Sequence, residues 1–228
     1  MSSFCDIGSD FKGKYKRRAI NSFVNATEKI MLEEGINKVT IRKVSDLAGY
    51  SSATIYSYFE NIDHLILFSS MKFLDEYIDA IPEYIKDEKK SIGVFKKVWE
   101  CFAHFAFKRA DIFHAMFFSK LDKKSENYMT DYYCIYPIKD NDYPEIIKKM
   151  LRGTTIYERN QILIDDCVKD GYVNKANSDE ISEMAVFIFE SILHRVCMNE
   201  LSPEEAEEKM RKYLNRILAI EGVNKKSK

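Results

Sequence analysis

The segment 44–55, with the sequence VSDLAGYSSATI, has the spacing of a helix-turn-helix. Two helices that cross at close range need a small residue facing the partner helix, a glycine at the turn and apolar residues inside both helices. Ser45 and Gly49 meet the first two needs, and Val44 and Ile55 meet the third. An ordinary helical hairpin has the same spacing, so the flanking sequence has to distinguish the two.

The flanking sequence is basic, although the whole chain is not. The 228 residues carry a formal net charge of −1, which alone argues against a nucleic-acid binder. Between Phe11 and Glu60, however, nine Lys and Arg residues outnumber five Asp and Glu residues, which gives a local charge of +4. A positive module of this size suits the phosphates of a nucleic acid.

Apolar spacing and capping residues predict helices on both sides of the segment. They are expected over 17–34, from Thr40 to Gly49 with Leu47 turned inward, over 53–59, and from Asn61 to just before Pro82. Residues 1–16 show little periodicity and are predicted to form a mobile basic arm.

The rest of the chain also indicates helices. Only 8 Gly and 4 Pro interrupt the sequence, which favours an all-α fold. Further helices are expected over 91–109, 111–118, 143–170 with an interruption near Gly153, 178–199 and 203–220. The polar, tyrosine-rich stretch 121–144 is predicted to be a long connection with little regular structure.

Composition also bears on location and redox state. No apolar run approaches the roughly 18 residues that a membrane span requires. The opening MSSFCDIGSDF lacks the layout of a signal peptide, so we expect a cytoplasmic protein without membrane contact. The five cysteines are an odd number without a CxxC pair, so we expect reduced thiols and no disulfide framework.

The N-terminal quarter of the chain resembles the DNA-binding domain of TetR-type transcriptional regulators. The resemblance is carried by residues 23–27, 35, 39–44, 48–51, 54–59 and 65, in which the run Thr-Ile-Tyr-x-Tyr-Phe after Ala-Gly-x-Ser is specific. It implies, within an all-α fold, a three-helix DNA-binding domain at 17–61 after the flexible basic arm at 1–16. A larger helical ligand-binding and dimerisation domain is implied at 62–228.

Carried over residue by residue, the resemblance implies that residues 52–58 enter the major groove of DNA. Ser52, Ala53 and Ser57 would face base edges, with Thr54 among them. Phosphate contacts would come from hydroxyl and guanidinium donors, at Thr40, Arg42, Ser51, Tyr56 and Tyr58. For Tyr58, packing in the core is an equal alternative. Because residues 52–58 contain no Arg or Asn, we expect thin direct readout, supplemented by DNA shape.

Two residues depart from the family pattern. Tyr50 stands where a smaller aliphatic residue is usual, which would enlarge the core of the hairpin. Ile62 stands where the pattern has a lysine that reaches a phosphate. A phosphate contact adds affinity without sequence information, so we expect weaker DNA binding and not its loss.

The aromatic residues of the second domain predict an apolar pocket between helices, although a helical core buries such residues as well. The candidate lining comprises Trp99, Phe102, His104, Phe105, Phe113, Met116 and Phe117. The helix over 178–199 is apolar on opposite sides, which predicts packing against its own core and against a second copy. Together with 157–167 it is expected to form a two-fold four-helix interface.

The resemblance implies a regulator that binds double-stranded operator DNA as a homodimer. We expect a repressor that is released from its operator by a small, largely apolar effector molecule, with no cofactor, and the sequence does not distinguish repression from activation. The helix after Asn61 is expected to transmit occupancy of the pocket to the DNA-reading helices.

Two alternatives stay open. A thiol- or metal-responsive regulator on the same scaffold would need clustered cysteines or a zinc site from Cys101-x-x-His104 and His194-x-x-Cys197. A helical enzyme would need a nucleophile with a paired base, a phosphate loop or a carboxylate cluster. The sequence shows none of these catalytic patterns, so we do not expect an enzyme.

Overall fold

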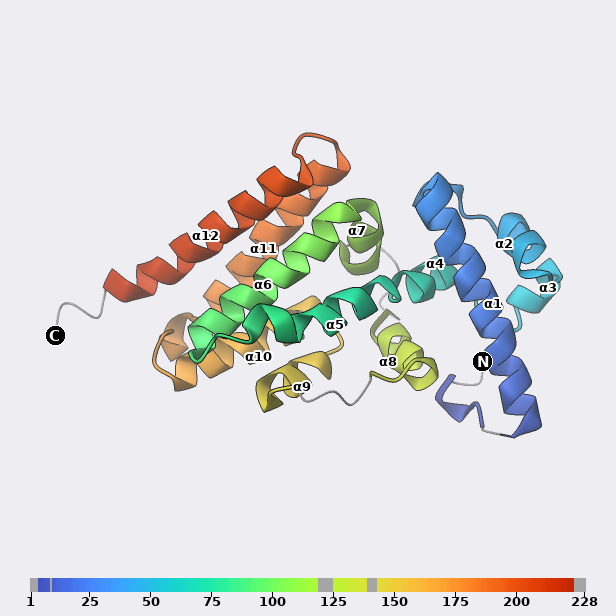
Figure 1. Cartoon of the computed structure of the whole chain (residues 1–228), viewed down its shortest axis with the longest axis horizontal. Helices are drawn as coiled ribbons and strands as arrows, with labels where there is room; N and C mark the ends of the chain where they lie inside the picture. The colour runs from blue at the N-terminus through green and yellow to red at the C-terminus, as the bar shows by residue number, and fades with distance from the viewer. Residues whose placement is uncertain (1–3, 9, 119–124, 139–142, 224–228) are drawn as a thin grey trace. The chain divides into compact units, whose positions relative to one another are not determined.

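The computed structural model describes residues 4–8, 10–118, 125–138 and 143–223, and within these ranges it contains helices and no strand (Figure 1). The predicted all-α fold is therefore confirmed. The chain forms two compact units. The first unit comprises residues 1–75 and 119–139, and the second comprises 76–118 and 140–228. The first unit thus ends at residue 75, later than the expected boundary at residue 61. It also includes the segment 119–139, which is distant in sequence from the rest of the unit.

The first unit is built around one long helix. Its elements are η1 (Phe4–Asp6), α1 (Phe11–Glu34), η2 (Ile36–Lys38), α2 (Ile41–Ala48), α3 (Ser52–Ile55), α4 (Ile62–Ser70) and α8 (Ser125–Ile135). Helix α1 packs against η2, α2 and α4, and α3 packs against α2. Figure 1 shows α2 and α3 together beside α1.

Helix α1 begins earlier than expected, at Phe11 in place of Arg17. The Asp10 carboxylate accepts a hydrogen bond from the Gly13 amide at 2.8 Å, so Asp10 is an N-cap that the apolar pattern did not reveal. Upstream, Phe4 is buried and stacks on Phe68 with ring centroids 4.9 Å apart. The stretch expected to be a mobile arm is therefore helical and packed at these positions, while residues 1–3 and 9 lie outside the described part.

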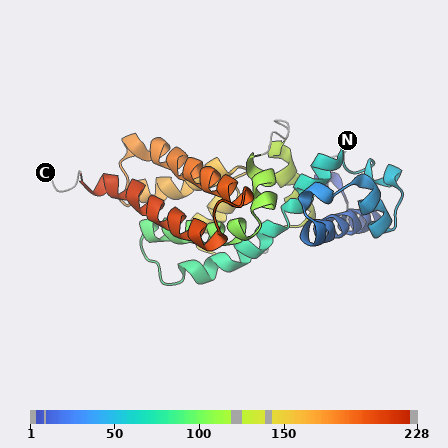
Figure 2. The same cartoon turned by 90° about the horizontal axis from the view of Figure 1, so that it is seen from above.

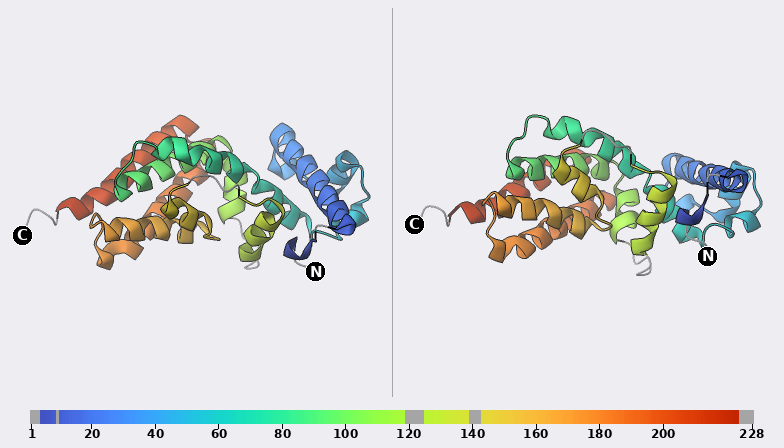
Figure 3. Two further views of the ribbon diagram at one scale, coloured as in Figure 1. Left: turned by 60° about the horizontal axis from the view of Figure 1, so that its bottom comes forward. Right: turned by 90° about the horizontal axis from the view of Figure 1, so that it is seen from below.

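Helix α8 occupies a stretch that we expected to be irregular. Met129, Tyr132 and Ile135 are buried along one side of it, at a spacing of three residues. The Tyr132 hydroxyl donates to Asp75 at 3.0 Å, and its ring meets that of Phe68. Tyr132, one of the tyrosines that indicated a polar loop, therefore packs with its ring inward and its hydroxyl paired. Helix α8 lies against η1 and α4 (Figure 3, yellow-green).

A disulfide joins Cys5 in η1 to Cys134 in α8, across 129 residues of sequence. This contradicts the expectation that all five thiols are reduced. Spacing gave no sign of the pair because the two cysteines are distant in sequence and meet only when α8 folds onto the first unit. Cys101, Cys167 and Cys197 are free thiols.

The helix expected from Asn61 to Pro82 is two helices. Helix α4 ends at Ser70, and α5 (Phe73–Ile85) follows after a turn in which the Lys72 amide donates to Ser69, three residues back. Helix α5 also continues past Pro82. A proline has no amide to donate to the carbonyl four residues earlier, which here belongs to Ile78. The Tyr143 hydroxyl donates to that carbonyl at 3.3 Å and replaces the missing bond.

The second unit contains the rest of α5 and the remaining helices. They are α6 (Ser91–Lys108), α7 (Ala110–Phe118), α9 (Glu145–Leu151), α10 (Ile156–Lys169), η3 (Lys175–Asn177), α11 (Ser178–Cys197) and α12 (Pro203–Val223). Helix α11 packs against α7, α10 and α12, and α6 packs against α12 (Figure 2). Within the described ranges, no helix is long and apolar enough to cross a membrane.

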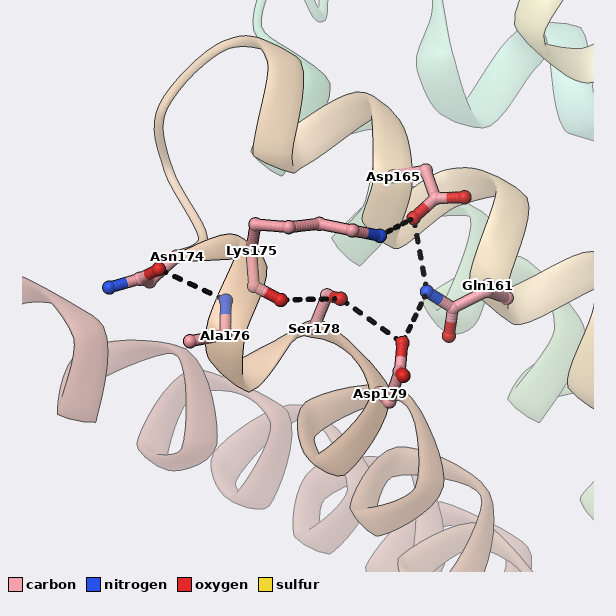
Figure 4. Close-up of polar contacts among 7 residues, drawn as sticks. All are labelled: Gln161, Asp165, Asn174, Lys175, Ala176, Ser178 and Asp179. Carbon is pink, nitrogen blue, oxygen red and sulfur yellow. Dashed lines mark hydrogen bonds and ion pairs between the residues drawn. The ribbon is translucent and has the colours of Figure 1, made fainter.

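A polar network fixes the connection between α10 and α11 (Figure 4). The Gln161 amide donates to Asp165 at 3.1 Å and to Asp179 at 3.4 Å, so one side chain links the two helices. The Ser178 hydroxyl lies between the Lys175 carbonyl and Asp179, and the Lys175 ammonium reaches Asp165. These contacts hold α10 and α11 side by side at the start of α11.

The core of the first unit contains a neutral histidine, which predicts a pH dependence of stability. His64 is 4% exposed, and burial lowers the pKa of its imidazole to about 4 from an ordinary 6.5. Between these two values the unfolded chain binds the proton and the folded chain does not. The free energy of unfolding should therefore be highest above pH 6.5 and fall toward pH 4, by up to about 1.4 kcal/mol per pH unit.

The control is His64→Asn. In the native protein His64 Nδ1 accepts a hydrogen bond from the Glu60 backbone amide at 3.2 Å, and the asparagine side-chain oxygen can accept the same bond. Denaturant unfolding between pH 7 and pH 5 should show a shallower pH slope for this variant, because the other histidines are common to both proteins. Equal slopes would contradict a neutral, buried His64.

Candidate nucleic-acid interface and internal cavity

The turn between α2 and α3 depends on Gly49 and Ser45. Gly49 adopts φ 74° and ψ 31°, a left-handed conformation that residues with a Cβ disfavour. The amides of Gly49 and Tyr50 both donate to the Ser45 carbonyl, at 3.0 and 3.1 Å. This arrangement closes α2 and directs the chain into α3, as the spacing of the segment predicted.

A hydroxyl bond fixes α3 against α2. Ser45 Oγ donates to the Arg42 carbonyl at 2.9 Å and lies 3.0 Å from Ser52 Oγ. Because the Ser45 proton is already used, Ser52 donates in this pair. Ser52 is exposed, so its oxygen faces solvent with free lone pairs and acts there as an acceptor.

Capping hydroxyls stand at the start of both helices. Thr40 Oγ1 accepts from the Lys43 amide at 3.3 Å, and Ser51 Oγ accepts from the Thr54 amide at 3.3 Å. Thr54 Oγ1 also lies 2.9 Å from Ser51 Oγ. Both N-caps are exposed, so two helix starts with partial positive charge face outward.

Residues 51–58, which we call the reading segment after its expected role, are less helical than expected. Regular α-helix ends at Ile55, and the next turn is tight, since the amides of Tyr58 and Phe59 both donate to the Ile55 carbonyl at 2.9 Å. Ala53 and Ser57 are exposed, and Tyr56 is 56% exposed. These positions, together with Ser51 and Ser52, form one outward surface of small and hydroxyl-bearing side chains.

Tyr58 differs from the rest of the reading segment because its ring is packed. It meets Phe23 of α1 with ring centroids 6.0 Å apart, and burial raises the pKa of its hydroxyl. Tyr50 meets the same phenylalanine at 5.0 Å, so the larger residue at this turn extends the core. The Tyr58 ring therefore packs against the core, which was one of the two roles expected for this residue. It holds the reading segment against α1.

Several basic side chains of the first unit are exposed, and others are engaged in contacts within it. The Arg42 side chain is 91% exposed, and Lys12, Lys14 and Arg18 are exposed on α1. Arg17, which belonged to the expected arm, instead donates to the carbonyls of Ile7, Cys134 and Ile135. It therefore holds the first unit together. Leu47, expected to point inward, is 48% exposed.

The second unit contains a small apolar cavity of about 30 Å³, close to the space of a single water. Its lining comprises Tyr77, Val98, Trp99, Phe102, Phe117, Met150, Ile156, Arg159, Asn160 and Leu163. The polar members are Arg159 and Asn160 of α10, which are both buried. The Trp99 indole donates to Asn160 Oδ1 at 2.8 Å, and the Asn160 amide donates to Ser182.

The sequence identified part of this lining. Trp99, Phe102 and Phe117 line the cavity, whereas Phe113 is packed in the core, and Phe105 and Met116 are half-buried outside the lining. The α9 and α10 residues were missed because they lie in a stretch where the aromatic pattern gave no signal. The pair Arg159 and Asn160, inside an otherwise apolar face, is the signal that would have identified α10.

His104 also lies outside the cavity lining. Its Nδ1 is 3.0 Å from Glu207 of α12, and its Nε2 is 2.9 Å from the Lys108 ammonium. Cys101, one turn earlier, donates instead to the Tyr77 carbonyl. Among the described residues, no group of three or more His, Cys, Asp and Glu side chains could hold a metal ion.

The outward faces of α10 and α11 carry unpaired apolar surface. Phe187 is 51% exposed, and Tyr157 is exposed on α10. Burial, and after it the carboxylates of Glu190 and Glu183, raise the pKa of Tyr157, so the outward faces of the two helices adjoin. This is the pair of helices for which the sequence predicted a two-fold interface.

Comparison with known proteins agrees with this architecture. Residues 23–67 match the model of the family described as bacterial regulatory proteins, tetR family. A relative from Haemophilus influenzae, named an uncharacterized HTH-type transcriptional regulator, is 24% identical over 76 residues. That match covers 33% of this chain, and the chain spans only 41% of the relative's length.

Solved structures extend the likeness in fold to most of the chain. The TetR-family transcriptional repressor FadR of Thermus thermophilus, solved in complex with lauroyl-CoA, has a TM-score of 0.60 and 11% identity. The alignment covers 87% of this chain and 93% of that chain. A putative TetR-family transcriptional regulator from Syntrophomonas wolfei has a TM-score of 0.60 and 16% identity, with 90% and 96% covered.

Identities this low show a shared fold, whereas the family match falls on the helix-turn-helix itself. The matched residues contain the Gly49 turn, the two capping hydroxyls and most of the helices that support them. Residues 23–67 therefore match the DNA-binding region of the tetR family of bacterial regulatory proteins, and the rest of the chain shares the fold of solved tetR-family structures.

Proposed function

We propose that the protein is a dimeric, DNA-binding transcriptional regulator whose reading segment enters the major groove, and that a small, largely apolar effector releases it from DNA. The observation that carries the proposal is the outward row of Ser51, Ser52, Ala53 and Ser57 at the helix-turn-helix. Such side chains suit a close approach to base edges, because they are short and carry acceptors or a methyl group.

The proposed DNA contacts divide between residues that read bases and residues that bind phosphates. Ser52 is an acceptor toward solvent, so it suits an amino group of adenine or cytosine, and the Ala53 methyl suits the methyl of thymine. Thr40, Arg42, Ser51 and Tyr56 stand around this centre and suit phosphates. Tyr58 contributes by bracing the segment on Phe23 and leaves its hydroxyl as a further candidate phosphate donor.

Dimerisation would use the outward faces of α10 and α11. Phe187 and Tyr157 lie there exposed, and a two-fold arrangement of two helices from each copy would cover them. A two-fold dimer presents two reading segments to two half-sites, which places the half-sites about 34 to 36 Å apart on a pseudo-palindromic operator.

The effector would enlarge the cavity of the second unit. At about 30 Å³ the cavity is too small for an organic effector, so binding requires movement of lining side chains such as Phe117. The lining is apolar apart from Arg159 and Asn160, which suits an apolar molecule with one polar group. The Thermus thermophilus repressor of the same fold was solved with lauroyl-CoA, so this fold accommodates a molecule with a long apolar chain.

DNA binding itself is the first test of the proposal. A duplex selected from a random pool should bind a dimer, and log K should fall with log salt at a slope of about −0.9 for each phosphate contact. Fluorescence anisotropy between 50 and 200 mM salt would measure this slope. Selection that enriches no duplex, a bound monomer, or an affinity that does not change with salt would refute the proposal.

Two substitutions separate base readout from phosphate contact. Ser52→Ala should cost about 1 kcal/mol on the preferred duplex and relax preference at one position, whereas Tyr56→Phe should weaken binding to all duplexes alike. Titration of duplex variants measures both effects. The matched control is Ser45→Ala, which removes the same Ser45–Ser52 bond but leaves the Ser52 hydroxyl in place. If Ser45→Ala relaxes preference as Ser52→Ala does, Ser52 has only a structural role.

The cavity makes a third prediction. Phe117→Ala should enlarge the cavity and raise affinity for an apolar dye such as anilinonaphthalene sulfonate, because the Phe117 ring lines it. Phe118→Ala removes the neighbouring ring, which does not line the cavity, and should leave dye affinity unchanged. Equal gains in the two variants, measured by fluorescence titration, would contradict an effector site at this place.

A further inference from the structure

The Cys5–Cys134 disulfide joins two parts of the first unit that only tertiary packing brings together. Cys5 lies in η1 and is exposed, and Cys134 lies in α8 and is partly exposed. The bond is therefore within reach of oxidants and reductants in solution. No other pair among the described cysteines is bonded, because Cys101, Cys167 and Cys197 are free.

The residues beside the two cysteines support the reading segment. Phe4, next to Cys5, stacks on Phe68 and meets Phe59 with ring centroids 5.7 Å apart. Phe59 directly follows the reading segment and is fully buried. Tyr132, two residues before Cys134, meets the same Phe68 at 5.4 Å. The disulfide thus ties η1 and α8 together where both pack against Phe68 of α4 and where η1 also packs against Phe59.

The contacts of α1 reinforce this link. The Arg17 guanidinium donates to the carbonyls of Cys134 and Ile135 at 3.4 and 3.3 Å, and to that of Ile7 at 3.3 Å. The same helix carries Phe23, which braces Tyr50 and Tyr58. Opening the disulfide would leave η1 and α8 held against each other by noncovalent contacts alone.

A protein that binds chromosomal DNA works in a reducing compartment, where disulfides are rare and are usually transient or redox-sensing. This step rests on the proposed function. The remaining thiols are poor competitors for an oxidant, because thiolate is the reactive form. Burial raises the pKa of Cys101 and of Cys167 to about 12, and it also raises the pKa of Cys197.

We propose that Cys5 and Cys134 form a reversible peroxide-responsive thiol pair, and that the disulfide form binds DNA more tightly than the reduced form. In the forward reaction the Cys5 thiolate attacks hydrogen peroxide, the O–O bond breaks, and Cys5 becomes a sulfenic acid as hydroxide leaves and takes a proton to form water. The Cys134 thiolate then attacks the Cys5 sulfur, the S–O bond breaks and a second water forms. A cellular dithiol reverses the reaction by exchange and is itself oxidised.

The direction follows from preorganisation. With the bond closed, Phe4 and Tyr132 are held on Phe68, so the support of the reading segment is ordered before DNA arrives. In the reduced protein η1 and α8 can separate from it, and DNA binding then includes the entropic cost of ordering them. We expect reduction to weaken binding at least about fivefold, the lower end of typical coupling between linked sites.

The test compares one protein in two states. Full-length protein is reduced with dithiothreitol, and a portion is oxidised with hydrogen peroxide. Thiol titration in denaturant should give five thiols per chain before oxidation and three after it. Affinity for the selected duplex should be higher after oxidation. Cys5→Ser and Cys134→Ser should abolish both changes, whereas Cys197→Ser, the matched control at a free and partly exposed thiol, should keep both.

Hydrogen exchange provides a readout that does not need DNA. Oxidation should slow exchange in α8 and at the start of α4, and Cys5→Ser should exchange like the reduced protein. Five thiols after peroxide, or equal exchange in the two states, would overturn the proposal. So would equal affinity of the two states for a duplex that both bind. If neither state binds any duplex, the proposed function fails, while the thiol count and exchange still decide whether the pair responds to peroxide.

Discussion

The Ser45 side chain and carbonyl determine the geometry on which the proposed DNA contact depends. Its carbonyl accepts hydrogen bonds from two amides of the turn. Its hydroxyl donates a hydrogen bond to the Arg42 carbonyl and also lies within hydrogen-bond distance of the Ser52 hydroxyl. A single buried residue therefore sets both the end of α2 and the position of α3. Gly49 makes this possible because the turn needs a positive φ. The exposed hydroxyls of the reading segment point outward as a consequence of this turn.

The structure gives this turn more support than three helices alone would provide. Asp10 caps the start of helix α1, and Phe23 of the same helix packs against Tyr50 and Tyr58 of the helix-turn-helix. Helix α8 comes from a later part of the chain and packs on α4 and η1. The chain therefore passes between the two units at 75–76, 118–119 and 139–140, where the sequence indicated one passage. Changes in the second unit consequently have more than one covalent route to the first.

Sequence reasoning succeeded where a local rule decides the structure. Gly49, the two N-caps and the apolar periodicity gave the helix-turn-helix, the family and most helices of the second unit. It failed where the deciding partner is distant. The Tyr143 hydroxyl lets α5 continue through Pro82, Phe68 packs against the inward ring of Tyr132 in α8, and Cys134 meets Cys5 only after folding. The lining from α9 and α10 was missed for another reason, because the aromatic pattern gave no signal there, although the pair Arg159 and Asn160 marked α10.

The central claim is that the surface fixed by Ser45 is the surface that reads DNA. A crystal structure of the protein on a selected duplex would test it most directly. The account predicts Ser52 and Ala53 at base edges in the major groove, with the Ser45–Ser52 bond retained and the Ser52 oxygen accepting from a base amino group. A complex in which residues 51–58 face away from the duplex, with DNA held by another surface of the chain, would contradict it.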